Sequence, residues 1–100
     1  MLTAKLVQQG SGRYAVQGDM SFATASELLA QSRALFVGQD TIDIDLSDVT
    51  HADSAGLAVL IEWLRGAKLK NQKIKYLSMP MQLKVLAEIS EIDGLFGRNS

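Results

Sequence analysis

Apolar and polar positions follow two different periods along the chain, and the change of period divides it into short elements. Residues 2–9 and 13–18 alternate at the spacing of two that is typical of β-strands, and the glycine-containing stretch 10–12 joins them. Two alternating runs with such a link predict a β-hairpin. Residues 41–49 form the clearest further strand, and residues 73–79 form another.

Three other segments repeat apolar residues every three or four positions, which is the spacing of one helix face. They cover residues 24–37, a run that follows the loop HADSAG and continues to Asn71, and residues 81–90. In the first segment, Thr24 followed by Glu27 fits a capping box, in which both side chains satisfy backbone amides at the helix start. In the last segment, we expect Val85, Leu86 and Ile89 to face the core.

The elements follow in the order ββαβαβα, and no linker, repeat or low-complexity stretch divides them, so we expect one domain over residues 1–100. A hairpin followed by strand–helix–strand units predicts an α/β fold. Within residues 41–49, Ile42 and Ile44 lie on one side of the strand and Asp43 and Asp45 on the other. Because parallel strands between two helix layers are apolar on both sides, this alternation predicts helices mainly on one face of the sheet.

Composition excludes several classes of function. The formal net charge of -1 offers no general attraction for nucleic acid or for an anionic membrane surface. With no cysteine and a single histidine, His51, neither a thiolate nor a multi-histidine metal site is possible. No apolar stretch approaches the ~20 residues that span a bilayer, and the first residues carry no signal segment. We expect a cytoplasmic protein without metal or cofactor, whose role at a membrane would need an embedded partner.

Two stretches imitate ligand-binding motifs. GSGRYA, at residues 10–15, matches the dinucleotide fingerprint G-x-G-x-x-G/A, but an alternating strand follows it where that motif needs a helix. DIDLSDVTHADS, at residues 43–54, has the first oxygen ligands of a calcium loop, yet Asp48 and Ser54 occupy the positions of the required glycine and glutamate. A hairpin turn and a solvated strand end with loop-capping acids explain these stretches better.

The proximity of His51 and Ser54 in the sequence raises the possibility of a hydrolase. A nucleophile elbow requires G-x-S-x-G, whereas this chain has ADSAG around Ser54. A third catalytic residue and an oxyanion hole would also have to fit into a small domain. We therefore expect a non-enzymatic protein, with His51 either solvated or in contact with a partner.

Ser54 lies where a strand-end loop becomes a helix. Ser54 or Asp53 is expected to cap the helix, because a side-chain oxygen there satisfies a free backbone amide. Capping does not explain Ala55 and Gly56, whose small side chains would let another surface approach the backbone. The same position suits a phosphate, since the helix dipole and the free amides favour negative charge. Ser54 is therefore a candidate phosphorylation switch at a contact surface.

The second helix carries Val59 and Trp63 one turn apart, beside the stripe of core residues that begins at Leu57. A tryptophan on that flank could seal the edge of the sheet. It could also anchor a partner, because tryptophan is enriched at binding hot spots. Both interpretations remain open at the level of the sequence.

The stretch IDIDLSDVTHADSAGLAVLIEWLR, residues 42–65, resembles the central motif of STAS domains, the modules of sulfate transporters and anti-sigma-factor antagonists. VQGDMSFATASELL and KIKYLSMPMQLKVLAEISEIDGLF, residues 16–29 and 73–96, are similar to the flanking segments of the family. The resemblance implies a SpoIIAA-like α/β fold, with a mixed sheet of four to five strands and helices mainly on one face.

The resemblance also implies partners, and two branches of the family compete. In one, a stand-alone STAS protein binds the ATPase subunit of the bacterial lipid-asymmetry (Mla) ABC transporter, a phospholipid transport system. In the other, an anti-sigma factor with kinase activity phosphorylates the serine of the D-S-x-G-L motif, which is Ser54 here. We favour the first branch, which would place the chain in the cytoplasm, peripheral to the inner membrane. The expected partner-binding residues in both are His51, Asp53, Ser54, Ala55, Gly56, Val59 and Trp63.

Overall fold

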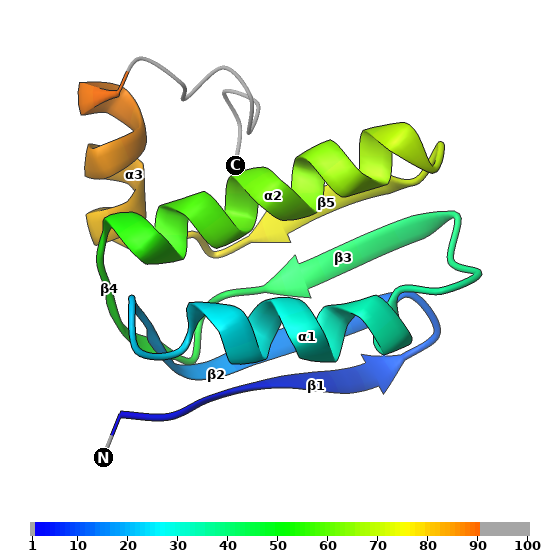
Figure 1. Cartoon of the computed structure of the whole chain (residues 1–100), viewed down its shortest axis with the longest axis horizontal. Coiled ribbons are helices and arrows are strands. Elements are labelled where there is room, and N and C mark those ends of the chain that lie inside the picture. Colours follow the sequence, from blue (N-terminus) through cyan, green and yellow to red (C-terminus); the bar gives the residue numbers. More distant parts are fainter. Residues whose placement is uncertain (1, 91–100) are drawn as a thin grey trace.

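The computed structural model describes residues 2–90, in which eight elements follow one another (Figure 1). They are β1 (Ala4–Gly10), β2 (Arg13–Met20), α1 (Ala25–Leu35), β3 (Thr41–Asp45), β4 (Val49–Ala52), α2 (Ser54–Leu69), β5 (Lys73–Leu77) and α3 (Met81–Ile89). The predicted order is thus confirmed except for β4, an additional short strand. The part of the one-domain prediction that concerns residues 91–100 lies outside the described residues.

The five strands form one mixed sheet. β1 pairs antiparallel with β2, as the predicted hairpin requires. The first part of β2 pairs in parallel with β3, and β3 pairs in parallel with β5. The last part of β2, from Gly18 to Met20, pairs in parallel with β4. β4 therefore continues the sheet beyond the end of β3 and leads directly into α2.

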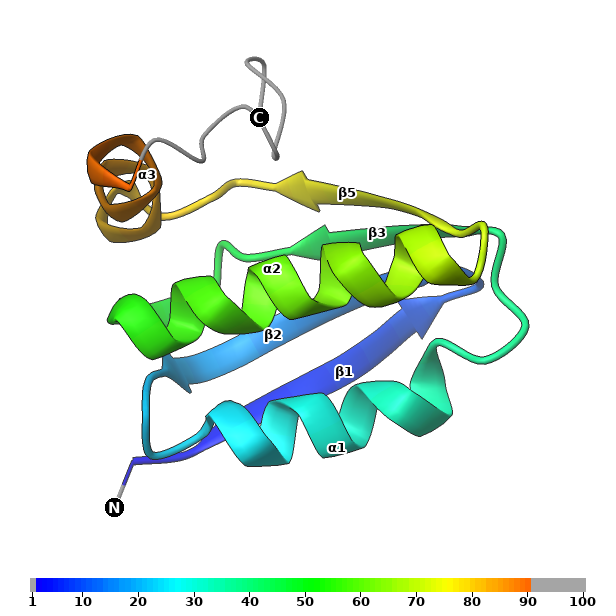
Figure 2. The ribbon, with the colours of Figure 1, turned by 45° about the horizontal axis from the view of Figure 1, so that its top comes forward.

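One face of the sheet carries the core, as the alternation predicts. Ile42, Ile44 and Tyr76 point from neighbouring strands into the core, and Figure 2 shows α1 and α2 side by side over one face of the sheet. On the opposite face Asp43 is the register neighbour of both Arg13 and Lys75. The open face of the sheet is thus charged and solvated.

The predicted capping box at the start of α1 is wrong. The helix begins at Ala25, and the Thr24 side chain makes no cap hydrogen bond. Its hydroxyl instead accepts from the backbone N–H of Ser21 and donates to the carbonyl of Asp19, which fixes the turn after β2. The Glu27 carboxylate accepts from the Gln31 side chain, one turn later in the helix.

The core-facing side of α3 also differs from the prediction. Leu83 and Ala87 are buried, Leu86 is partly buried, and Val85 and Ile89 are exposed. The apolar residues of this short helix extend around more than one face. The sequence alone therefore did not determine which side of α3 faces the core. Among residues 2–90, no helix is both long enough and apolar enough to cross a bilayer.

The two imitations of ligand motifs have structural explanations. The GSGRYA stretch contains the hairpin turn, with Gly12 at a φ of 70°, and the first three residues of β2. Asp45 ends β3 by accepting a hydrogen bond from the backbone N–H of Ser47, with an N–O distance of 2.9 Å. Within residues 2–90, no group of acidic or histidine side chains is placed to hold a metal ion.

Candidate functional site

Asp53 is the residue that caps α2. Its backbone is extended, and its Oδ1 accepts hydrogen bonds from the backbone N–H groups of Ala55 and Gly56, at 2.8 and 3.3 Å. Its Oδ2 accepts from the backbone N–H of Phe22 at 3.3 Å. One carboxylate thus satisfies two amides of the first helical turn and joins the start of α2 to the turn before α1.

Ser54 is the first residue of α2, and its side chain is exposed. Because Asp53 supplies the cap, the hydroxyl of Ser54 is not needed for this purpose. It makes no hydrogen bond with the rest of the described chain. The structure therefore leaves a solvent-facing hydroxyl at the positive end of the helix dipole, where a phosphate would be electrostatically favoured by the dipole.

Gly56 is buried, and the surface that approaches it belongs to the chain itself. A Cβ atom at this position would lie 3.0 Å from the Cβ of Met20, 3.1 Å from its carbonyl carbon, and closer still to its carbonyl oxygen. That oxygen accepts a hydrogen bond from the backbone N–H of Asp53 at 3.1 Å. The interpretation of Gly56 as an opening for another molecule is wrong, because the end of β2 occupies this space.

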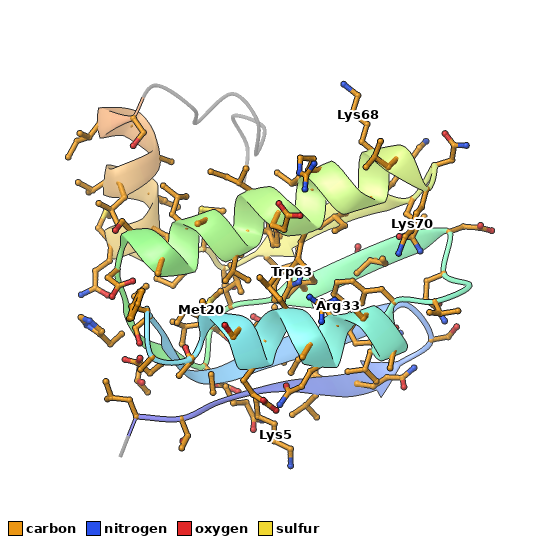
Figure 3. The ribbon with its side chains drawn as sticks, in the orientation of Figure 1. Lys5, Met20, Arg33, Trp63, Lys68 and Lys70 are labelled. Carbon is orange, nitrogen blue, oxygen red and sulfur yellow. The ribbon has the colours of Figure 1, made fainter. Side chains whose placement is uncertain are left out.

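Val59 and Trp63 lie in the core, so their predicted position beside the core stripe is also wrong. Their exposed fractions are 1% and 4%. The indole N–H of Trp63 donates to the hydroxyl of Ser32 on α1 at 2.9 Å, and its ring packs edge-on against Phe36 at 5.6 Å between centroids. Figure 3 shows Trp63 in the space between α1 and α2. Contact of these two residues with a partner stays a prediction, limited to the small areas that remain accessible.

His51 lies on β4, where it pairs with Asp19 of β2 in the strand register, and its side chain is exposed. The following residue is tied to α3, since the backbone N–H of Ala52 donates to the side-chain carbonyl of Gln82 at 3.0 Å. No hydrogen bond joins His51 to Ser54 in the described structure. The geometry thus lacks the nucleophile–base contact that a hydrolase would use.

Phe22 is the site residue that sequence reasoning missed. It is 88% exposed, and its backbone N–H donates to the Asp53 carboxylate, so Phe22 lies beside the start of α2. The only signal in the sequence is a single aromatic residue within the turn segment DMSFAT. We use the name helix-start surface for the group formed by Phe22, His51, Asp53, Ser54 and Ala55; Figure 1 shows the segments that carry it at the same end of the molecule.

Comparisons with known proteins agree with this architecture. The family model described as "Mlab, STAS domain" matches residues 7–97. The intermembrane phospholipid transport system binding protein MlaB of Haemophilus influenzae is 34% identical over an alignment of 77 positions, and the match covers 72% of this chain and 72% of that protein.

Two solved structures share the fold at low sequence identity. A sulfate transporter family protein from Wolinella succinogenes has a TM-score of 0.72 at 16% identity and covers 95% of this chain and 78% of its own. The phosphorylated form of the Bacillus cell fate determinant SpoIIAA has a TM-score of 0.68 at 16% identity, with coverage of 92% and 86%. The likeness to SpoIIAA confirms the predicted fold class. The family model extends over most of the chain, which therefore belongs to the STAS domain family.

Proposed function

We propose that this protein is a non-enzymatic STAS subunit that binds and supports the ATPase of a phospholipid ABC transporter of the Mla type. Two findings support the proposal: the family model that matches the chain carries the Mlab description, and the relative in Haemophilus influenzae is named as part of a phospholipid transport system. Such a subunit would act in the cytoplasm and reach the inner membrane through the transporter.

The observation that carries the binding role is the helix-start surface. It combines an exposed aromatic residue, Phe22, with an exposed hydroxyl at Ser54. The Asp53 carboxylate accepts a hydrogen bond from the backbone N–H of Phe22 and caps the helix that Ser54 begins. Aromatic residues, phenylalanine included, are enriched at protein–protein interfaces relative to the rest of the surface. The surface offers contacts to a protein, whereas no catalytic pair is assembled on it.

Co-purification tests the proposal. A tagged chain isolated from native membranes is expected to retain an ABC ATPase, and Phe22→Ala is expected to weaken that association about fivefold or more. Leu69→Ala is the matched control, since Leu69 is 76% exposed and lies at the opposite end of α2. Equal retention by both variants would contradict the assignment of the helix-start surface, and absence of an ATPase would contradict the proposed partner.

The alternative is an anti-sigma-factor antagonist regulated by phosphorylation of Ser54. Its support is the exposed hydroxyl, which has no structural role among residues 2–90. A phosphoryl group there would add about -1.5 to -2 charges beside Asp53 and disturb an acidic or closely packed partner. This alternative predicts that Ser54→Asp releases a kinase-like partner and that Ser54→Ala cannot be phosphorylated. The transporter function predicts that Ser54→Ala still binds the ATPase.

A further inference from the structure

A groove with a volume of about 490 Å³ runs between α1 and α2 and lies outside the helix-start surface for most of its length. Small or apolar residues form much of its walls: Ala25 and Leu29 on α1, and Ala58 and Gly66 on α2. Phe36 and Trp63 line it as well. A groove of this volume is in the usual range for small-molecule sites in proteins, which are mostly apolar with a few placed polar groups.

The polar atoms at the bottom of the groove already have partners. The indole N–H of Trp63 donates to the hydroxyl of Ser32, and that hydroxyl donates to the carbonyl of Leu29 at 2.7 Å. A ligand lying against these residues therefore gains little from hydrogen bonds there. Peptide groups would be desolvated without compensation, whereas a hydrocarbon chain would lose nothing.

The groove is also elongated, which suits a chain-like occupant. It lies along α1 and α2, which contact each other over the same face of the sheet (Figure 2). The groove extends along α2 from Ala55 to Lys70, which corresponds to about 22 Å at 1.5 Å per residue.

Two cationic side chains line one end of the groove. Arg33 comes from the last turn of α1 and Lys70 follows the last turn of α2. Figure 3 shows both beside the space between the two helices, while Lys5 and Lys68 extend away from it. Neither Arg33 nor Lys70 has an acidic partner within residues 2–90. Glu62 also lines the groove, but it is paired with Arg65 at 2.6 Å.

We propose that this groove binds a small amphipathic anion, a single hydrocarbon chain that ends in a carboxylate or a phosphate. The anionic end lies between Arg33 and Lys70, and the chain extends over Trp63 toward Ala58. This site is independent of the proposed function, because it does not need the ATPase or the hydroxyl of Ser54.

The emission of Trp63, the single tryptophan of the chain, provides a direct measurement. The purified protein is titrated with dodecanoate, with dodecyl phosphate, and with neutral dodecyl glucoside, each below its micelle concentration. We expect a saturable change at one ligand per chain for at least one of the anions, and binding about tenfold weaker or more for the glucoside, since charge-assisted hydrogen bonds are lost. The stronger of the two anions identifies the carboxylate or the phosphate as the headgroup.

Variants test whether the anions bind in the groove or elsewhere on the surface. A Cβ at Gly66 would meet no atom within 4 Å, so Gly66→Leu is expected to fold and to fill the groove. It should abolish the response to the anions. Arg33→Gln combined with Lys70→Gln should weaken anion binding about tenfold, whereas Lys5→Gln combined with Lys68→Gln should leave it unchanged. Circular dichroism checks that each variant is folded.

Several results would overturn the proposal. One is a titration with both anions that leaves the emission of Trp63 unchanged. Equal affinity for the glucoside would contradict the proposed anionic headgroup. Unchanged binding in the variant that combines Arg33→Gln with Lys70→Gln would contradict it as well. If no amphiphile binds but Gly66→Leu loses the co-purified ATPase, the groove belongs to a protein partner, and the proposal of a small ligand is wrong.

Discussion

The close contact between Gly56 and Met20 predicts that a single methyl group at position 56 destabilises the whole domain. In Gly56→Ala, the added Cβ would lie closer than 3.0 Å to the carbonyl oxygen of Met20. This oxygen cannot retreat freely, because it accepts the hydrogen bond from the backbone N–H of Asp53. Relief of the overlap must therefore move either the end of β2 or the first turn of α2, and either movement disturbs the capped helix start.

The change in the free energy of unfolding caused by Gly56→Ala is the difference between two opposing effects. Overpacking against a fixed backbone costs about 3 kcal/mol, at the upper end of the usual range. Replacing glycine by alanine in a helix returns at most about 1 kcal/mol. We therefore expect Gly56→Ala to lower the free energy of unfolding by about 2 kcal/mol. This loss corresponds to a decrease in Tm of about 8–16 °C for a domain of this size.

Gly66→Ala is the matched control on the same helix. Its Cβ meets no atom within 4 Å, so only the gain in helix propensity remains. We expect stabilisation by about 0.5–1 kcal/mol. Urea unfolding followed by Trp63 emission and by circular dichroism measures both variants. If Gly56→Ala is as stable as the unmodified protein while Gly66→Ala gains stability, the steric reasoning at position 56 is refuted.

Three further predictions concern the cap, the core and the alkaline range. Asp53→Ala removes the acceptor for the first amides of α2 and should lower stability by about 0.5–2 kcal/mol in urea unfolding, whereas an unchanged midpoint would contradict its role as cap. Trp63→Phe removes an indole N–H that is bonded to a buried serine, and should cost about 1–3 kcal/mol in the same assay; a smaller loss would mean that this bond contributes little. Burial raises the pKa of Tyr76 well above 10.0, and its hydroxyl donates to the carbonyl of Leu60. The folded state therefore retains a proton that the unfolded chain loses, so stability should fall as the pH rises above about 10. Tyr76→Phe should flatten this decline in unfolding experiments between pH 8 and pH 11, although burial also raises the pKa of Tyr14 and leaves a residual slope.

Local periodicity could predict the elements whose own residues show a clear apolar side and a clear polar side. In β3, Ile42 and Ile44 alternate with two aspartates, and the structure places the first pair in the core and the second on the open face. β4 could not be predicted in this way. Its four residues, Val49–Ala52, are ordered by pairing with the end of β2, about thirty positions earlier in the chain.

The errors at the candidate site have the same origin. Helical spacing places Trp63 beside Leu60 and Leu64, but its burial depends on α1, which supplies Ser32 and Phe36. The capping box at Thr24 matched a local rule, yet the turn after β2 uses the hydroxyl instead. Phe22 gave almost no local signal, because its position beside the start of α2 depends on a carboxylate on a distant segment. Sequence patterns located the cap of α2 at Asp53 or Ser54 correctly, but the loop expected over residues 51–56 is wrong, because β4 extends to Ala52 and α2 begins at Ser54. The contacts across elements decide which residues of α2 face solvent.

At the start of α2 the structural roles are divided among neighbours. Asp53 accepts hydrogen bonds from the first backbone amides of the helix. Gly56 has no Cβ and so leaves room for the end of β2, and Leu57 contributes to the core. Ser54 has none of these roles, so a change of its side chain should alter the surface while stability stays within about 0.5 kcal/mol. A phosphate or a substitution at Ser54 would therefore act on a partner rather than on the fold. This separation is what a switch requires, and it allows the same folded domain to serve either a permanent subunit contact or a regulated one.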